Sequence, residues 1–370
     1  MRVLIATVTA GAGHVQAARA LDEAWRAWRP QDEIETIDVL KYTPELYEKA
    51  YSRGYVKLVD KAPELYALAF RKSDDPKKVR RFSGARRLAG RLAAAPFVDK
   101  VRAMALDVVV CTHFMPPEIL GRMKEKGRLR APIVSVVTDF EAHAFWLEDS
   151  VDRYCVAFDH TKARLAARGV PEREIHVTGI PVGARFAAPP TKAQARKRLG
   201  LGLKGPVLLV LGGGFGMGPL EAISSQLDRV EGPLEAVIVC GRNEELKKTL
   251  SARRFKHPTT VLGFAENMHE LMAASDLVAT KPGGLTSSEA LAVGRPLLIM
   301  NPLPGQEEAN SDFLLENGAA AKATPEDLPS RLSSLLGSPR LASMAAAAKS
   351  LGRPGAALEI CKLAHDAAAA

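Results

Sequence analysis

A glycine-rich turn that ends in a histidine is the first place in the sequence where chemistry could occur. The apolar run Val3–Val8 leads into Gly11 and Gly13, and His14 follows just before a helical pattern. Glycines let the backbone turn tightly and approach a ligand, and a helix N-terminus favours negative charge. A histidine can accept the proton of an alcohol near neutral pH. We therefore predict that His14 is a general base beside a bound substrate.

The same turn matches part of the dinucleotide-binding pattern G-x-G-x-x-G, but Gln16 occupies the position of the third glycine. Asp38 ends the second predicted strand. In that pattern an acid about 20 residues on binds a ribose hydroxyl. A nicotinamide-dependent oxidoreductase is therefore one alternative, and a structural turn that binds no ligand is another.

Two glycine-rich turns in the second half of the chain also follow predicted strands. Five of the seven residues in 212–218 are glycine, which suits a close approach to a phosphate or a sugar. Residues 280–290 place Thr286 and Ser287 in the first turn of a predicted helix, with Glu289 just inside it. Amides and hydroxyls at a helix start suit a diphosphate, and a carboxylate could accept hydrogen bonds from ribose. Simple capping of this helix is the alternative.

Polar side chains follow the last predicted strand of this half. Gln306, Glu307 and Asn310 cluster within residues 304–310. Such a cluster suits the hydroxyls of a sugar, although the same side chains could cap a helix. The P-loop pattern G-x-x-x-x-G-K-[ST] does not occur in the sequence, so the chain is not a P-loop NTPase.

Strand and helix patterns alternate along nearly the whole chain, as in α/β proteins with parallel sheets. We expect two Rossmann-like domains that face each other across a cleft, with ligands at the carboxyl ends of the strands. The first domain comprises residues 1–182 and the second residues 183–351, while residues 352–370 return to pack on the first. The predicted strands are Val3–Val8, Ile34–Val39, Val108–Cys111, Ile133–Val137, Tyr154–Ala157, Ile175–Val177, Val207–Leu211, Ala236–Cys240, Thr260–Leu262, Leu277–Thr280 and Leu297–Met300.

The composition is that of a globular protein, with 47% hydrophobic and 25% charged residues, and it excludes a disordered or fibrous chain. The four cysteines lie far apart and lack metal-ligand spacing, so we expect reduced thiols in a cytoplasmic protein. No apolar run reaches the roughly 18 residues needed to span a bilayer.

Basic residues gather in one part of the chain. The whole chain has a net charge of +9, and residues 71–102 alone hold eleven Lys and Arg against three Asp. Apolar residues lie among these charges, a combination that anionic membrane surfaces attract. A solvated helical face is an equal alternative, and nucleic acid is not expected because only Phe82 and Phe97 could stack on bases. The predicted membrane contacts are Arg80, Arg81, Arg86 and Arg87.

Three stretches together resemble one family. They are TAGAGHVQAARAL near the N-terminus, KPGGLTSSEA from Lys281, and PLLIMNPLPGQEEANSDFLLENGAA from Pro296. These stretches look like the monogalactosyl- and diglucosyl-diacylglycerol synthases, which are GT-B glycosyltransferases akin to the MurG-type enzymes. The resemblance implies a UDP-sugar donor in the C-terminal half and a lipid acceptor handled by the N-terminal half.

The resemblance also implies roles for individual residues. His14 matches the proposed base, with Asp139 as a supporting acid and Gly11 and Gly13 on the acceptor side. Glu289 would bind the ribose. The resemblance would place Gly263 and Phe264 at the uracil, Gly283, Gly284, Thr286 and Ser287 at the diphosphate, and Gln306 and Glu307 at the sugar. Apart from the resemblance, the glycine turn with Gly213 and Gly214 would approach a phosphate or a sugar, Arg242 would meet the leaving diphosphate, and Asn310 would suit sugar hydroxyls.

The predicted reaction is an inverting hexosyl transfer from UDP-glucose or UDP-galactose to diacylglycerol or a glycosyl-diacylglycerol. The sequence contains no Asp-x-Asp, and helix-start amides can stabilise the leaving diphosphate, so we expect neither an obligatory metal ion nor a cofactor. A MurG-like transfer of N-acetylglucosamine to a polyprenyl-linked acceptor is the principal alternative. A UDP-sugar 2-epimerase and a non-catalytic lipid-surface protein are the others.

Overall fold

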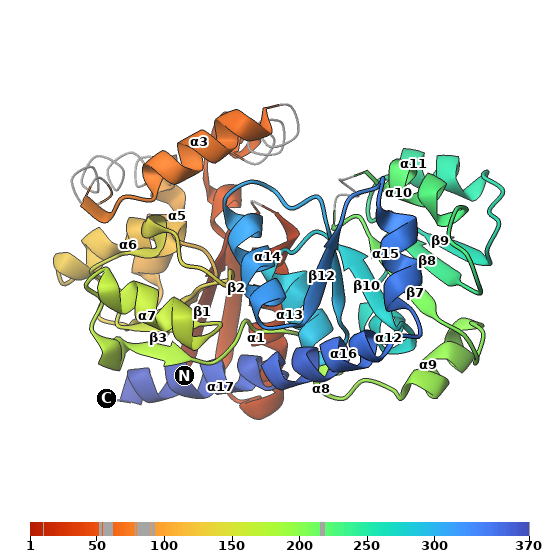
Figure 1. The fold of residues 1–370 in the computed structure, drawn as a ribbon. Coiled ribbons are helices and arrows are strands. Elements are labelled where there is room, and N and C mark those ends of the chain that lie inside the picture. Colours follow the sequence, from red (N-terminus) through yellow and green to blue (C-terminus); the bar gives the residue numbers. More distant parts are fainter. Residues whose placement is uncertain are drawn as a thin grey trace. The chain divides into compact units, whose positions relative to one another are not determined.

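The computed structural model describes residues 1–9, 11–51, 54, 62–77, 79, 90, 93–214 and 219–369. The chain forms two compact units (Figure 1). The N-terminal unit contains Met1–Ala184, Pro304–Gln306 and Gly355–Ala370, and the C-terminal unit contains Arg185–Leu303 and Glu307–Pro354. Within the described residues each unit has one six-stranded parallel sheet, as the α/β pattern predicts.

The sheet of the N-terminal unit has the strand order β2-β1-β3-β4-β5-β6. The order reverses between β1 and β3, and the carboxyl ends at such a reversal are the usual ligand site of an open α/β sheet. The bounds are β1 (Arg2–Thr7), β2 (Glu33–Asp38), β3 (Val108–Cys111), β4 (Ile133–Val136), β5 (Arg153–Val156) and β6 (Ile175–Val177).

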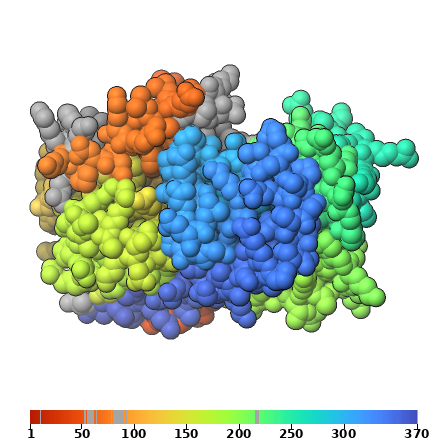
Figure 2. Space-filling view, in the orientation of Figure 1, coloured from red at the N-terminus to blue at the C-terminus, as the bar shows by residue number. Residues whose placement is uncertain are grey.

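Alternate residues of these strands pack into two separate hydrophobic clusters, as the two-residue period of a strand requires. Val3 and Ile5 of β1 join one cluster, which α1 (Ala12–Trp28) and α17 (Ala356–Ala369) cover. Leu4 and Ala6 join the other, which lies under α5 (Ala95–Ala103), α6 (Met115–Glu125) and α7 (Asp159–Ala167). Helix α3 (Pro63–Ser73), orange in Figure 2, lies on the outside of this unit. The 3-10 helices are η1 (Val39–Tyr42), η2 (Ala144–Trp146) and η3 (Glu172–Glu174).

The sheet of the C-terminal unit has the order β12-β11-β10-β7-β8-β9 and reverses between β7 and β10. Its strands are β7 (Val207–Leu211), β8 (Glu235–Val239), β9 (Thr259–Leu262), β10 (Leu277–Thr280), β11 (Leu297–Met300) and β12 (Ala320–Ala323). The helices from 184 to 351 are α8 (Ala184–Ala187), α9 (Lys192–Leu199), α10 (Leu220–Leu227), α11 (Glu244–Ser251), α12 (Met268–Ala274), α13 (Gly284–Ala292), α14 (Gln306–Glu316), α15 (Leu328–Leu335) and α16 (Pro339–Leu351).

The eleven strands predicted from the sequence are present, each within one residue at either end. Strand β12 is not among them because its sequence, AAKA, consists of residues that favour helices. It forms at the sheet edge by pairing with β11. None of the helices in the described part of the chain combines the length and apolar character needed to cross a bilayer.

Candidate active site

His14 lies in the first turn of α1, at the reversal point of the N-terminal sheet. The helix begins directly after Gly11, whose φ of 124° is a backbone conformation that suits glycine. The ring Nδ1 is 2.9 Å from the carbonyl oxygen of Thr112 and 2.8 Å from the Thr138 hydroxyl oxygen. Thr112 directly follows β3, and Thr138 comes shortly after the neighbouring strand β4. Residues from three elements therefore converge on one imidazole.

The hydrogen bond to Thr112 determines which ring nitrogen of His14 carries the proton. A carbonyl oxygen can only accept, so Nδ1 donates and Nε2 keeps an unprotonated lone pair. No described residue is hydrogen bonded to Nε2. Burial lowers the pKa of His14 to about 4, against the opposing effect of the Thr112 hydrogen bond. The side chain is therefore neutral at pH 7, in the form that a general base requires.

Thr112 and His113 complete the surroundings of His14. The Thr112 hydroxyl donates to the His14 carbonyl at 3.0 Å, so Thr112 holds both the backbone and the ring of the histidine. The His113 ring packs edge-to-face on His14 with centroids 4.7 Å apart, and burial lowers its pKa well below the usual value. His113 Nδ1 accepts from the Met115 amide. The sequence prediction missed both residues, although their place after a buried strand was a usable signal.

Asp139, the predicted supporting acid, is buried beside this group. Its carboxylate accepts a hydrogen bond from the side-chain amide of Gln306. Gln306 belongs to the short segment 304–306, which is part of the N-terminal unit although it lies between two segments of the C-terminal unit in the sequence. The structure thus pairs Asp139 with Gln306 and places the neighbouring Thr138 at the His14 ring. The catalytic role of Asp139 stays a prediction.

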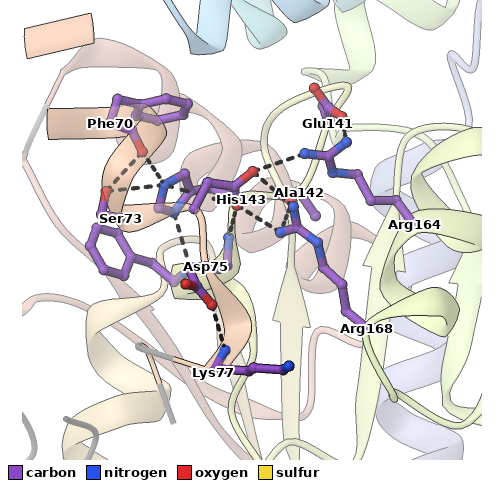
Figure 3. A network of polar contacts seen from close by, with 12 residues as sticks. Phe70, Ser73, Asp75, Lys77, Glu141, Ala142, His143, Arg164 and Arg168 are labelled. Atoms are coloured by element: carbon purple, nitrogen blue, oxygen red, sulfur yellow. Dashed lines mark hydrogen bonds and ion pairs between the residues drawn. The ribbon is translucent and has the colours of Figure 1, made fainter. Parts of the chain in front are cut away.

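The loop that follows Asp139 is tied to the end of α3 (Figure 3). His143 Nδ1 accepts from the Phe145 amide, so Nε2 carries the proton and donates to the Phe70 carbonyl oxygen at 3.1 Å. The Ser73 hydroxyl lies 3.3 Å from the same Nε2. Burial lowers the pKa of His143, so the ring is neutral and acts as a link between the loop and the helix.

Asp74, directly after α3, strengthens this link. Its two carboxylate oxygens each accept from Arg168 at 2.8 Å, and Oδ1 also accepts from the Ala144 amide at 2.7 Å. Arg164 reaches both Asp74 and Glu141. Arg168 also donates to the Ala142 carbonyl (Figure 3). Burial alone would raise the pKa of Asp74, but Arg168 and the Ala144 amide hold it below the usual range. The carboxylate therefore stays charged at neutral pH.

In the C-terminal unit the turns after β7, β8 and β9 lie at the carboxyl ends of neighbouring strands. A Cβ on Gly241, whose φ is +60°, would lie 2.5 Å from the Gly213 carbonyl oxygen, so only glycine fits there. The Arg242 amide donates to the Gly214 carbonyl at 3.2 Å, and its guanidinium lies 5.2 Å from the centroid of Phe264. The structure thus brings the predicted donor residues Gly213, Gly214, Arg242, Gly263 and Phe264 to one edge of the sheet.

The turn after β10 leads into α13, with Gly283 as its N-cap and Gly284 and Thr286 in the first turn. The N-cap Gly283 makes no side-chain hydrogen bond to this helix start, and the first amides of a helix have no partner within the helix. The Ser287 hydroxyl is buried and has no hydrogen-bond partner among the described residues. Free amides at the positive end of a helix are suited to an anionic group such as a diphosphate.

Glu289 lies one turn further along α13. It is partly buried, and no described residue makes a hydrogen bond to its carboxyl group. Burial raises the pKa of Glu289 to about 8. A partly buried carboxyl group without a hydrogen-bond partner costs stability, so it is a candidate for a ligand that supplies hydrogen bonds.

The predicted sugar contacts at the start of α14 make contacts within the protein. Glu307 accepts from the Leu303 amide at 2.8 Å and lies 3.5 Å from Lys281. Asn310 is fully buried and donates to the Pro282 carbonyl at 3.0 Å. These two side chains hold the turn that precedes α13. Their sugar contacts stay predictions.

Comparison with known proteins shows the family of this chain. The sequence model of the family Monogalactosyldiacylglycerol (MGDG) synthase matches residues 14–182, and that of the Glycosyltransferase family 28 C-terminal domain matches residues 207–359. The processive diacylglycerol beta-glucosyltransferase of Bacillus cereus (strain AH187) is 32% identical, covering 95% of this chain and 90% of that protein. The protein of the same name from Bacillus pumilus (strain SAFR-032) is 28% identical, covering 86% and 82%. The chain belongs to this glycosyltransferase family.

The fold of the glycosyltransferase is GT-B, with two Rossmann-like units. MurG of Acinetobacter baumannii aligns with a TM-score of 0.61 at 18% identity, over 99% of each chain. HepE of Anabaena, solved in complex with UDP-glucose, aligns with a TM-score of 0.56 at 14% identity, over 99% of this chain and 98% of that one. At these identities the likeness concerns the fold alone.

Membership of this family sets aside the nicotinamide alternative. Asp38, the acid on which that alternative rested, accepts from the amide and hydroxyl of Thr9 and from the Leu40 amide. It therefore fixes the turn after β1 and caps η1.

Two other expectations remain predictions. Among the described residues, no three His, Cys, Asp or Glu side chains converge into a metal-binding group, which leaves the predicted metal independence of the glycosyltransferase to experiment. The predicted membrane contacts Arg80, Arg81, Arg86 and Arg87 lie outside the described residues.

Proposed function

We propose that this enzyme transfers a hexose from a UDP-sugar to diacylglycerol or a glycosyl-diacylglycerol, with inversion at the anomeric carbon. The observation that carries the proposal is the neutral His14, whose Nδ1 is bonded to Thr112 and whose Nε2 is available to accept a proton. The relatives named processive diacylglycerol beta-glucosyltransferase supply the acceptor class and favour glucose as the sugar.

In this mechanism Nε2 of His14 accepts the proton of the acceptor hydroxyl as its oxygen attacks the anomeric carbon. The bond from that carbon to the diphosphate oxygen breaks on the opposite side, and UDP leaves with the electron pair. The amides at the start of α13 stabilise the negative charge of the leaving diphosphate, and Arg242, which follows β8 of the same sheet, adds a positive charge. Glu289 accepts hydrogen bonds from the ribose, which satisfies its carboxyl group.

The enzyme acts, in this proposal, as a peripheral protein on the inner face of the cell membrane, because its acceptor lives in the bilayer. Helix α3 supports this part of the proposal. Its side chains Leu65 and Leu68 are 58% and 45% exposed, and Arg71 and Lys72 follow in its last turn. Exposed leucines next to basic residues are the pattern of a helix that lies at a lipid interface. The contacts of Asp74 and His143 hold the end of this helix on the N-terminal unit.

A donor panel tests the proposal. Purified enzyme is incubated with radiolabelled UDP-glucose, UDP-galactose or UDP-N-acetylglucosamine and with vesicles of anionic phospholipid that contain diacylglycerol. We expect label in a glycolipid, with UDP-glucose as the best donor and a β-linkage in the product. Transfer of N-acetylglucosamine to a polyprenyl-linked acceptor alone would overturn the proposal in favour of a MurG-like reaction. UDP-sugar turnover without any acceptor would instead indicate an epimerase.

A further inference from the structure

The His14 ring has two hydrogen-bond acceptors at one nitrogen. The Thr112 carbonyl oxygen and the Thr138 hydroxyl oxygen lie 2.9 and 2.8 Å from Nδ1. Thr138 is only 5% exposed, and His14 is the hydrogen-bond partner of its hydroxyl among the described residues. A buried hydroxyl aimed at the nitrogen opposite the reacting one is well placed to affect the chemistry at Nε2.

The chemistry of the partners decides the direction of both hydrogen bonds. Because Thr112 offers a carbonyl, the proton is on Nδ1, and the Thr138 oxygen must accept a share of the same N–H. A ring flip would replace this N–H by a C–H and lose both hydrogen bonds. The pair therefore fixes the plane of the ring as well as its tautomer.

Among the described residues, His113 is the ionisable side chain in ring contact with His14. Its lowered pKa keeps His113 neutral, so it supplies no charge to balance an imidazolium. Asp139, next to Thr138, accepts a hydrogen bond from Gln306, whereas the oxygens within hydrogen-bond distance of His14 Nδ1 belong to Thr112 and Thr138. When Nε2 takes a proton, the positive charge spreads over the ring, and hydrogen bonds to a charged group are stronger than those to a neutral one. The Thr138 oxygen is then in a position to stabilise the imidazolium.

We propose that Thr138 is a positioning residue for His14: its hydroxyl, together with the Thr112 carbonyl, holds the ring with Nε2 as the base and stabilises the imidazolium formed during transfer. The inference rests on the proposed role of His14 as the base. It gives to Thr138 the supporting role that the sequence assigned to its neighbour Asp139.

The test uses three variants of the full-length enzyme. Thr138→Val keeps the shape of the side chain and removes the hydroxyl, and Thr138→Ser keeps the hydroxyl. Thr178→Val is the matched control, because Thr178 is an equally buried threonine after β6 whose hydroxyl bonds to the Gly179 carbonyl. We expect Thr138→Val to lower kcat for glycolipid formation by about 10- to 100-fold, with the KM for the UDP-sugar within about twofold. Thr138→Ser and Thr178→Val should stay within about threefold of the wild type.

Nitrogen-15 NMR of protein labelled at histidine provides a readout that does not depend on activity. The His14 signals are assigned by their loss in His14→Ala. We expect a protonated Nδ1 and an unprotonated Nε2 in the wild type and in Thr138→Ser, and a mixture of tautomers or ring orientations in Thr138→Val.

Two results would overturn the inference: wild-type kcat and NMR signals in Thr138→Val, or equal loss of kcat in the serine and valine variants. If no donor gave a glycolipid, the proposed function would fail. The NMR comparison would still decide whether Thr138 holds the ring.

Discussion

At the scale of single residues, the environment of His14 makes a specific prediction about pH. Burial lowers its pKa to about 4, so the unprotonated base persists well below the usual histidine range. Only the protonated ring is inactive, so at saturating UDP-glucose acidification should reduce kcat only as the pH approaches 4. We expect kcat at pH 5.5 close to that at pH 7, measured by glycolipid formation over pH 4.5–8 with UDP-glucose kept saturating at each pH and circular dichroism as a check on folding. An acid limb centred near 6.5 would contradict the described environment of this ring.

Glu289 leads to a second prediction, for donor affinity. Burial raises its pKa to about 8, so the free enzyme holds this carboxyl group mostly protonated at pH 7. Ribose hydroxyls donate best to the charged form, which becomes more populated as the pH rises toward 8. The affinity for UDP-glucose should therefore increase up to about tenfold per pH unit between pH 6 and 8 and level off above pH 8.

Calorimetry on the wild type and on Glu289→Gln measures this dependence. The glutamine variant should bind UDP-glucose more weakly at pH 8 and with no pH dependence over this range. Glu316→Gln is a suitable comparison, because Glu316 is an exposed carboxylate at the end of α14 and is not among the predicted donor contacts. An unchanged pH dependence in Glu289→Gln would show that another group is responsible.

At the scale of elements, the sequence predicted the strands and glycine turns well because both are local. Buried parallel strands such as β3 and β7 are short apolar runs, and the turns after β1 and β10 carry glycines at a strand-to-helix junction. The C-terminal helix α17 packs on α1, and its alanine-rich sequence alone specified a helix but not this partner.

The partners of His14 could not be predicted in the same way. Thr112 reaches the ring because β3 pairs beside β1 in register, across about a hundred residues of chain. The choice between Thr138 and Asp139 depends on side-chain direction, since neighbouring residues in extended chain point to opposite sides. A sequence pattern that is uncertain by one residue cannot distinguish them.

The link between α3 and the loop after Asp139 gives a prediction at this scale. Asp74→Asn removes the charge that binds Arg168 and weakens the contact with Ala144. We expect faster hydrogen exchange in residues 63–73 and in 140–146, and a free energy of unfolding lower by about 1–3 kcal/mol. Asp99→Asn, at an exposed acid paired with Arg102, is the control and should change neither measurement. Unaltered exchange in both segments of Asp74→Asn would mean that this network does not hold α3.

At the scale of the whole molecule, the charge distribution predicts how the enzyme reaches its acceptor. The excess of positive charge is concentrated in residues 71–102, which follow the exposed leucines of α3 in the sequence. Changing Arg80, Arg81, Arg86 and Arg87 to Gln should weaken binding to anionic vesicles by about 100-fold or more, at about 1 kcal/mol per basic residue. Binding is measured by flotation at low and high salt.

A matched variant tests whether vesicle binding depends on this segment or only on the net charge of the protein. Four exposed basic residues of the C-terminal unit, changed together to Gln, should leave vesicle binding within about threefold of the wild type. Equal weakening by both sets would indicate nonspecific attraction, and no weakening by the arginine set would make residues 71–102 an ordinary solvated face. The control residues are Lys197, Lys204, Lys248 and Arg254.

The central claim is that His14 is the base of a sugar transfer to a lipid, and one measurement tests it most directly. The rate of label transfer from UDP-glucose to diacylglycerol in anionic vesicles is compared between the wild type and His14→Ala, with UDP affinity measured on both. We predict a labelled glycolipid from the wild type, a rate at least about 100-fold lower in the variant, and equal affinity for UDP. Transfer at the wild-type rate by His14→Ala, or no lipid product from a wild type that binds UDP, would contradict the account.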